Sequence, residues 1–306
     1  MFDSVSKDYP VGDWGLRRDI YEDSGSISFY AEGMHHYWIS YVVVGASRNL
    51  GLGFVRYLSS DPKNKVFALV RNKATTTQLQ EYVDSDANKY RNVIVIEADL
   101  NDYKSIKAAA TAVSEVTGGE LDVLINNGAL LHQERNWVTI DEFPDEETLE
   151  EDFLTFFKTN AIGATHVINA FIPLLRAGTT KKILAVTSSL GSPLFALVIS
   201  QSACPAYSIS KAALNMVIAK FATRFKNDGF TFLAVSPGLI KTMPGPPDVV
   251  DKIYEGEIAK LRQINPNFGF VSVEQSVKDQ ISLLEKMTPA DAFVHANGDD
   301  ANYPSY

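Results

Sequence analysis

The chain has 306 residues, 45% of them hydrophobic, so it can bury a full core and we expect a folded protein rather than a disordered one. It carries 28 Lys and Arg against 37 Asp and Glu, a formal net charge of -9, and it lacks a basic run with interleaved aromatics, which argues against a nucleic-acid partner. A single cysteine, Cys204, excludes an internal disulfide, and the histidines lack metal-ligand spacing, so no metal is expected.

Residues 1–38 are rich in Gly, Ser and Asp with scattered aromatics and no clear period, and we predict an irregular N-terminal extension there. Its first residues carry charges throughout and contain no apolar run of signal-peptide length. No later segment is apolar for long enough to span a bilayer. We therefore predict a cytoplasmic protein without a membrane partner.

From residue 39 onward, short apolar runs alternate with helical patterns. The strand-like runs cover residues 39–44, 65–70, 93–97, 121–125, 181–187, 230–235 and 291–295. The candidate helices cover residues 51–60, 74–84, 102–117, 148–176, 206–227 and 272–287. Because the runs do not alternate apolar with polar residues, we expect strands that are buried on both faces. The pattern predicts one doubly wound α/β domain over residues 39–306, with about seven parallel strands and helices on both faces.

Three segments interrupt this alternation, and we predict variable loops near a substrate site at 130–150, 189–205 and 240–270. Residues 141–152 hold eight carboxylates, which fits either a solvated acidic first turn of the next helix or a lid. The apolar residues after 189 fit either a pocket roof or a partner-facing patch. The Pro-rich stretch after 240 is typical of a mobile insertion.

A glycine-rich turn follows the first predicted strand. Gly45 directly follows the strand, and Gly51 and Gly53 lie inside the start of the next helix, a spacing that lets backbone N–H groups approach a pyrophosphate. Asn49 stands where a further glycine is expected. Asn adopts a positive φ readily, so we predict that it keeps the turn at a cost below about 1–2 kcal/mol. Taken alone, the turn also fits an ordinary α/β protein.

Tyr207 and Lys211 lie four residues apart and therefore share one face of a predicted helix. A nearby ammonium favours the phenolate, so we expect Lys211, together with a cofactor's charge, to lower the pKa of Tyr207. Tyr103 and Lys107 have the same spacing but no Ser-rich strand end before them, so we predict that Tyr103 is a surface residue. Cys204 is predicted to be a packed small hydrophobe rather than a reactive thiol.

The order and spacing of five motifs resemble the short-chain dehydrogenase/reductase family over residues 39–297. The matching segments are the turn at 44–51, "ADL" at 98–100, "NNGA" at 126–129, "TNAIG" at 159–163 and "SPGLIKT" at 236–242. The resemblance implies a Rossmann-like domain with four catalytic residues, namely Asn160, Ser188, Tyr207 and Lys211, and it leaves Ser189 as the alternative serine. It implies that a nicotinamide cofactor is bound by Gly45, Ser47, Arg48, Asn49, Leu50, Gly51, Arg71, Asp99, Leu100, Asn126, Tyr207, Lys211, Pro237, Leu239 and Thr242. In the family, the residue that Asp99 matches contacts the adenine and the one that Thr242 matches contacts the nicotinamide amide.

The chain departs from the family pattern at four places. Val44 replaces a Thr, Asn49 replaces a Gly, the last two residues of "NNGA" are exchanged, and Ser188 lies unusually far before Tyr207. NAD-selective members carry an acidic residue at the end of the second strand, whereas this chain has Arg71 there and Arg48 in the glycine turn. Two guanidinium groups favour NADP(H), unless both are only solvated surface residues.

The exchanged "NNGA" and the C-terminal run "FVHANG" look like fungal reductases of polyketide and aromatic secondary metabolism. The resemblance implies an NADPH-dependent reductase, or the reverse dehydrogenase, with a small-molecule carbonyl or alcohol substrate and Tyr207 as the general acid. Homo-oligomers are usual in the family. A non-catalytic NADP(H)-binding sensor or scaffold is the alternative.

Overall fold

The computed structural model describes residues 38–131, 135, 137–242, 247–263, 266–291 and 295–297. The extension predicted over residues 1–38 therefore lies, except for its last residue, outside the described residues.

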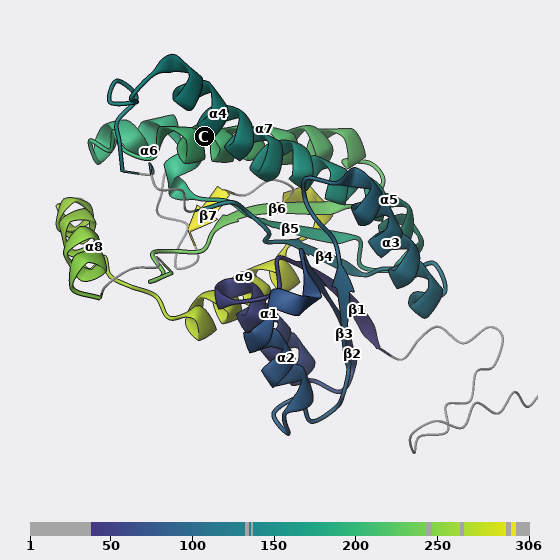
Figure 1. Cartoon of the computed structure of the whole chain (residues 1–306). Helices are drawn as coiled ribbons and strands as arrows, with labels where there is room; N and C mark the ends of the chain where they lie inside the picture. The colour runs from purple at the N-terminus through teal and green to yellow at the C-terminus, as the bar shows by residue number, and fades with distance from the viewer. Residues whose placement is uncertain are drawn as a thin grey trace, which may run out of the picture. The chain divides into compact units, whose positions relative to one another are not determined.

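One parallel sheet forms the centre of the domain (Figure 1). Its seven strands have the order β3-β2-β1-β4-β5-β6-β7, so the winding direction reverses between β1 and β4. The strands are β1 (Ile39–Val44), β2 (Asn64–Val70), β3 (Val93–Glu97), β4 (Val123–Asn126), β5 (Lys182–Val186), β6 (Thr231–Ser236) and β7 (His295–Asn297). The predicted doubly wound α/β domain with about seven parallel strands is confirmed.

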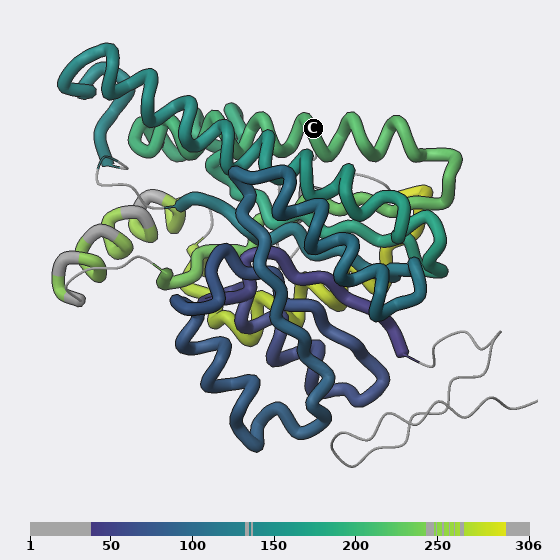
Figure 2. Tube along the Cα trace, turned by 45° about the vertical axis from the view of Figure 1, so that its right-hand side comes forward, coloured from purple at the N-terminus to yellow at the C-terminus, as the bar shows by residue number. Residues whose placement is uncertain are grey.

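Helices cover both faces of the sheet (Figures 1 and 2). One face is covered by α1 (Asn49–Ser59), α2 (Thr77–Asp84) and α9 (Val273–Lys286). The other is covered by α3 (Tyr103–Thr117), α5 (Ala164–Ala177) and α7 (Pro205–Phe225), and α4 (Glu146–Phe157) lies beside α7. Short helical turns connect these elements at η1 (Lys73–Thr75), η3 (Ser189–Gly191) and η4 (Pro289–Asp291).

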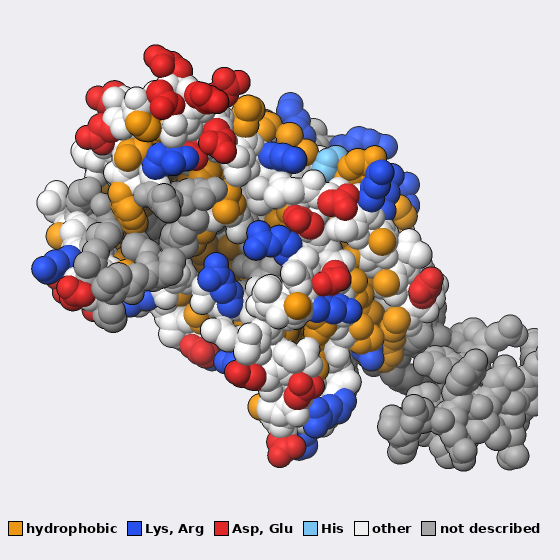
Figure 3. All heavy atoms as spheres, in the orientation of Figure 1, with side chains coloured by type: hydrophobic (Ala, Val, Ile, Leu, Met, Phe, Trp, Pro, Cys, Tyr) orange, Lys and Arg blue, Asp and Glu red, His pale blue; other side chains and the backbone are white. Residues whose placement is uncertain are grey.

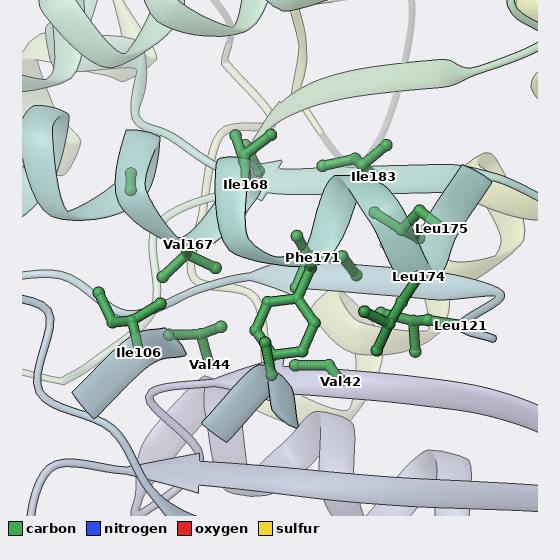
Figure 4. Packing of buried hydrophobic residues seen from close by; sticks show 14 of the residues in the cluster. Val42, Val44, Ile106, Leu121, Val167, Ile168, Phe171, Leu174, Leu175 and Ile183 are labelled. Atoms are coloured by element: carbon green, nitrogen blue, oxygen red, sulfur yellow. The ribbon is translucent and has the colours of Figure 1, made fainter. Parts of the chain in front are cut away.

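The sheet separates two hydrophobic cores. Alternate residues of β1 enter opposite cores, with Val42 and Val44 facing α3, α5 and α7, and Val43 facing α1 and α9. Phe171 of α5 is fully buried and lies between Val42, Val44 and the other helical side chains of its core (Figure 4). Full burial of such a side chain contributes roughly 1.5–3 kcal/mol. Both faces of β1 are therefore apolar, which explains why its sequence does not alternate.

Two predicted elements differ in the structure. The helix expected over residues 148–176 is a continuous run of α4, a π-helical turn η2 (Lys158–Gly163) and α5. Gly163 is the last residue of the π-helical turn, and a larger residue does not fit there because an added Cβ would lie 2.7 Å from Leu100 O. The last strand was expected at 291–295, whereas β7 covers His295–Asn297 and Asp291 belongs to the helical turn η4; residues 292–294 lie outside the described residues.

Two of the segments predicted as loops contain helices, α6 (Pro193–Val198) and α8 (Pro247–Arg262). Val250, Tyr254, Ile258 and Leu261 of α8 are buried and recur with helical spacing. The prolines just before this pattern masked it, although Pro247 stands at the first helical position, where proline is well tolerated.

The acidic residues of the 130–150 segment lead into α4. The Asp145 side chain accepts a hydrogen bond from Thr148 N at 2.7 Å, and Glu146 and Glu147 occupy the first turn, where they complement the helix dipole. Acidic side chains gather over this end of α4 (Figure 3). Asp152 differs from these, because it is buried and pairs with Arg135 through two hydrogen bonds of 3.0 and 2.7 Å.

Candidate active site

The predicted site residues follow the carboxyl ends of the strands, on both sides of the point where the strand order reverses. In open α/β sheets, ligands bind at this edge. The face shown in Figure 3 is hollowed near its centre, and Lys and Arg side chains border the hollow. The first predicted residue after each strand is Gly45 for β1, Arg71 for β2, Asp99 for β3, Asn126 for β4 (its last residue), Ser188 for β5 and Pro237 for β6.

The turn between β1 and α1 has a left-handed backbone at two positions. Gly45 has φ 72°, and Asn49 has φ 48°, as predicted for a residue that replaces glycine. The side chain of Asn127 donates to the carbonyl groups of Val44 and Gly45, at 3.2 Å each. A Cβ on Gly51 would lie 2.0 Å from Gly45 O, so only glycine fits there. The Asn127 side chain therefore helps to hold the turn, and Gly45 and Gly51 leave no room for side chains of their own.

The residues of this turn fit an anionic dinucleotide. Arg48 precedes α1 without capping the helix through its side chain, and the first turn of α1 contains no acidic residue, so the helix N-terminus favours a negative charge. Arg48 and Arg71 are exposed, and neither pairs with an acidic residue among those that the structure describes. Ser47 is half-buried and Leu50 is buried beside them.

The groups at the ends of β3 and β4 are less exposed than Arg48 and Arg71. The Asp99 carboxylate accepts from Asn101 N at 2.9 Å, and Leu100 packs against Gly128 and Gly163. Asn126 is buried; its Nδ2 donates to Ala164 O at 3.3 Å, and its Oδ1 has no hydrogen-bond partner among the described residues.

Helix α7 places Tyr207 and Lys211 on one buried face. Lys211 Nζ lies 5.8 Å from the centre of the Tyr207 ring and donates to Val186 O, at the end of β5, at 2.9 Å. The ring of Phe156 meets Tyr207 edge-on, with 6.3 Å between ring centres. Tyr207 is 8% exposed and Lys211 only 2%. Both polar groups are thus held in an apolar setting.

Burial shifts both pKa values, and for Tyr207 in the direction opposite to the expectation from the sequence. Burial raises the pKa of Tyr207, the hydrogen bond with the Ser188 side chain offsets part of this rise, and Cys204 adds to it. Burial also lowers the pKa of Lys211 to about 8. Burial is thus the largest influence on the pKa of Tyr207 in the protein alone, and the lowering expected from Lys211 together with a cofactor's charge stays a prediction.

The two neighbouring serines point to different partners. The Ser188 side chain hydrogen-bonds Tyr207, and its Oγ accepts from Leu190 N at 3.2 Å. Ser189 Oγ lies 3.0 Å from Ser236 Oγ, in the loop after β6. The geometry thus favours Ser188 as the hydroxyl that shares a substrate atom with Tyr207.

Asn160 lies in the π-helical turn η2, a type of irregularity that is frequent at functional sites. Its Oδ1 accepts from Leu130 N at 2.7 Å, and its Nδ2 donates to Leu130 O at 3.0 Å and to Ser210 Oγ at 2.9 Å. Ser210 Oγ in turn donates to Tyr207 O at 2.7 Å. Asn160 therefore joins the chain after β4 to the helix that carries Tyr207.

The loop after β6 contains Pro237, Leu239 and Thr242. Ser276 Oγ of α9 donates to Pro237 O at 2.6 Å, and Val271 N donates to Leu239 O at 3.0 Å. Thr242 N donates to the hydroxyl of Tyr254, in α8, at 3.1 Å. The loop is thus supported by residues that follow it in the chain.

Several supporting residues were not identified from the sequence. Asn127 and Gly128 stand inside the quoted "NNGA" motif, so that motif could have pointed to them. Ser210, Tyr254 and Ser276 have no sequence signal, because each acts through a contact with a distant segment.

Tyr103 and Cys204 lie as predicted. Tyr103 is 49% exposed and stacks with Lys107, whose Nζ lies 5.8 Å from the ring centre. Cys204 is buried in the cluster that contains Tyr207. In the part of the chain that the structure describes, no group of three acidic, His or Cys side chains could hold a metal ion, and no helix is long and apolar enough to cross a membrane.

Comparisons with known proteins agree with this geometry. A family model described as short chain dehydrogenase matches residues 40–246. The short chain dehydrogenase virK of Hypocrea virens is 39% identical over 251 residues, which is 80% of this chain and 91% of that protein. The short-chain dehydrogenase/reductase AacuF of Aspergillus aculeatus is 36% identical over 256 residues, or 81% of this chain and 92% of that protein. The crystal structure of an NADPH-bound carbonyl reductase from chicken fatty liver superposes with a TM-score of 0.68 at 26% identity, covering 86% of this chain and 97% of that one.

Proposed function

Since the chain belongs to the short-chain dehydrogenase/reductase family of oxidoreductases, we propose that it is an NADPH-dependent reductase of a small-molecule carbonyl. The observation that carries the proposal is the contact of Ser188 with the phenol of Tyr207, beside the buried ammonium of Lys211, at the carboxyl edge of the sheet.

NADP(H), when bound, supplies the hydride for the carbonyl carbon. Tyr207 gives its proton to the carbonyl oxygen, and Ser188 donates a hydrogen bond to the negative charge that develops on that oxygen. Burial raises the pKa of Tyr207, so the phenol is protonated at neutral pH and ready to act as an acid. Lys211 places a positive charge next to the phenolate that forms, and Asn160 fixes the position of α7.

Two observations support NADP(H) over NAD(H). Arg48 and Arg71 are exposed where the 2′-phosphate would lie, and guanidinium groups bind phosphate well. The carbonyl reductase from chicken fatty liver, which has a similar structure, is described as NADPH-bound.

Apolar side chains around Tyr207 support an aromatic or polyketide-like ketone as the substrate class. Leu130, Leu131, Leu190 and Ala203 are partly buried and pack around the cluster that contains Tyr207. The nearby helix α6 exposes further apolar side chains, with Leu197 at 78%. The similarity to the relatives from Hypocrea virens and Aspergillus aculeatus is consistent with this substrate class.

A screen of aromatic and cyclic ketones with NADPH and NADH in parallel tests the proposal. We expect oxidation of NADPH with at least one ketone class, and we expect Tyr207→Phe to abolish turnover while cofactor binding remains. NADPH binding without turnover on a broad carbonyl panel would instead support the sensor or scaffold alternative.

A further inference from the structure

The hydroxyl of Tyr254 connects α8 to the loop after β6. It donates to Ile240 O at 3.2 Å and accepts from Thr242 N at 3.1 Å. One hydroxyl thus bridges the carbonyl of Ile240 and the N–H of Thr242, two residues apart. Tyr254 is 6% exposed, and its ring meets Phe270 edge-on at 5.2 Å between ring centres.

Lys241, between Ile240 and Thr242, also contacts α8 and Phe270. Lys241 Nζ lies 2.8 Å from Asp251 Oδ1 of α8 and 4.6 Å from the centre of the Phe270 ring. Leu239 pairs with Phe270 in an isolated parallel bridge. The four residues from 239 to 242 are therefore held in succession by α8 and by Phe270.

We propose that Tyr254 is a positioning residue for the cofactor, because its hydroxyl sets the backbone of Ile240 and Thr242 and so directs Thr242 toward the nicotinamide amide. The inference rests on the proposed function, which places the nicotinamide end of NADP(H) at this loop. Helix α8 thereby contributes to cofactor affinity through the hydroxyl group of Tyr254.

Removal of this hydroxyl has a local effect. The carbonyl of Ile240 and the N–H of Thr242 lose their shared partner next to a buried side chain, and the loop relaxes. The amide group is common to NADPH and NADH, so both lose the same factor in affinity. Arg48 and Arg71 lie at the 2′-phosphate end, and substitution of either weakens NADPH alone.

Calorimetric titration of the full chain with NADPH and with NADH tests this on Tyr254→Phe, Thr242→Ala and the double variant. We expect Tyr254→Phe to weaken both dinucleotides by about tenfold, the effect of one lost hydrogen bond. In the Thr242→Ala background, the same change should weaken them by less than about twofold, because Tyr254 acts through Thr242.

Tyr82→Phe is the matched control. The Tyr82 hydroxyl is also buried and lies 2.7 Å from Ser59 Oγ, at the far end of α1. We expect the two Tyr→Phe variants to lose similar thermal stability and only Tyr254→Phe to lose affinity.

Three outcomes would overturn the inference. Equal affinity loss from Tyr254→Phe with and without Thr242 would show that the two residues act independently. A fall in Tm with unchanged dissociation constants would show a purely structural role. A wild-type chain that binds neither dinucleotide would reject the proposed function and this inference together, whereas the first two outcomes leave the proposed function intact.

Discussion

The two sides of the site are built by different means. On the β1 side, the turn requires glycine, since a side chain at Gly45 or Gly51 would collide with neighbouring backbone. On the β4 to β6 side, the site depends on polar side chains that reach across the fold, such as Asn160, Ser188 and Lys211. The first side is set by steric exclusion and the second by hydrogen bonds in a desolvated interior. A substitution on the β1 side should therefore abolish cofactor binding outright, whereas a substitution on the β4 to β6 side should lower activity only in part.

The largest effect is expected from Gly51→Ala. The new Cβ would lie 2.0 Å from Gly45 O and 2.8 Å from Asn127 Nδ2, so the turn must open. We expect a loss of more than about 3 kcal/mol in the free energy of unfolding and no measurable NADPH binding. Chemical denaturation and NADPH titration measure both. Gly256→Ala in α8 is the control, because its Cβ meets nothing within 4 Å and should be neutral or slightly stabilising. A Gly51→Ala protein that still binds NADPH would contradict the steric account.

Ser188→Ala and Ser189→Ala test the other side of the comparison. Ser188 hydrogen-bonds Tyr207, so its loss should lower kcat by about 10²-fold, the usual effect of removing one donor to a developing oxyanion. Ser189→Ala removes a contact with Ser236 and should leave kcat largely unchanged. Steady-state kinetics with any ketone found in the screen decides between them. A larger loss of kcat in Ser189→Ala than in Ser188→Ala would show that Ser189, and not Ser188, is the catalytic serine.

The same contrast explains which parts could be predicted from the sequence. β1 and β3 begin and end where their apolar runs do, and the glycine turn is recognisable because its spacing is local. The choice between two adjacent serines depends on side-chain direction, which no spacing encodes. The burial that raises the pKa of Tyr207 is a property of the folded core, so no spacing predicts it, and the lowering expected with a cofactor's charge stays a prediction. Tyr254 gave no signal, since its partners at 240 and 242 meet it only after α8 has docked.

A third prediction concerns the pH dependence of stability. Burial lowers the pKa of Lys211 from 10.5 to about 8, so between these values the unfolded chain binds more protons at this group than the folded chain does. Raising the pH from 8 to 10 should therefore stabilise the wild type relative to Lys211→Met, by about 2 kcal/mol. Below pH 8 the difference between the two proteins should be constant. Urea unfolding at several pH values measures this, and a flat difference up to pH 10 would show that Lys211 keeps an ordinary pKa.

The smallest effect is expected from Asn49→Gly, and it returns the comparison to the β1 side. Asn49 has φ 48° and is exposed, so its side chain is not needed for the turn if backbone geometry alone makes the cradle. Glycine adopts this φ without strain, and we expect NADPH binding to be retained or slightly tightened, with stability changed by less than about 1 kcal/mol. Asn49→Ala is the matched variant, because it removes the same amide but adds backbone strain of roughly 1 kcal/mol. If the two variants lose affinity equally, the loss comes from the amide and not from φ. The β1 side would then depend on a side chain as the β4 to β6 side does, and the contrast between the two sides would fail at the one position where this chain departs from glycine.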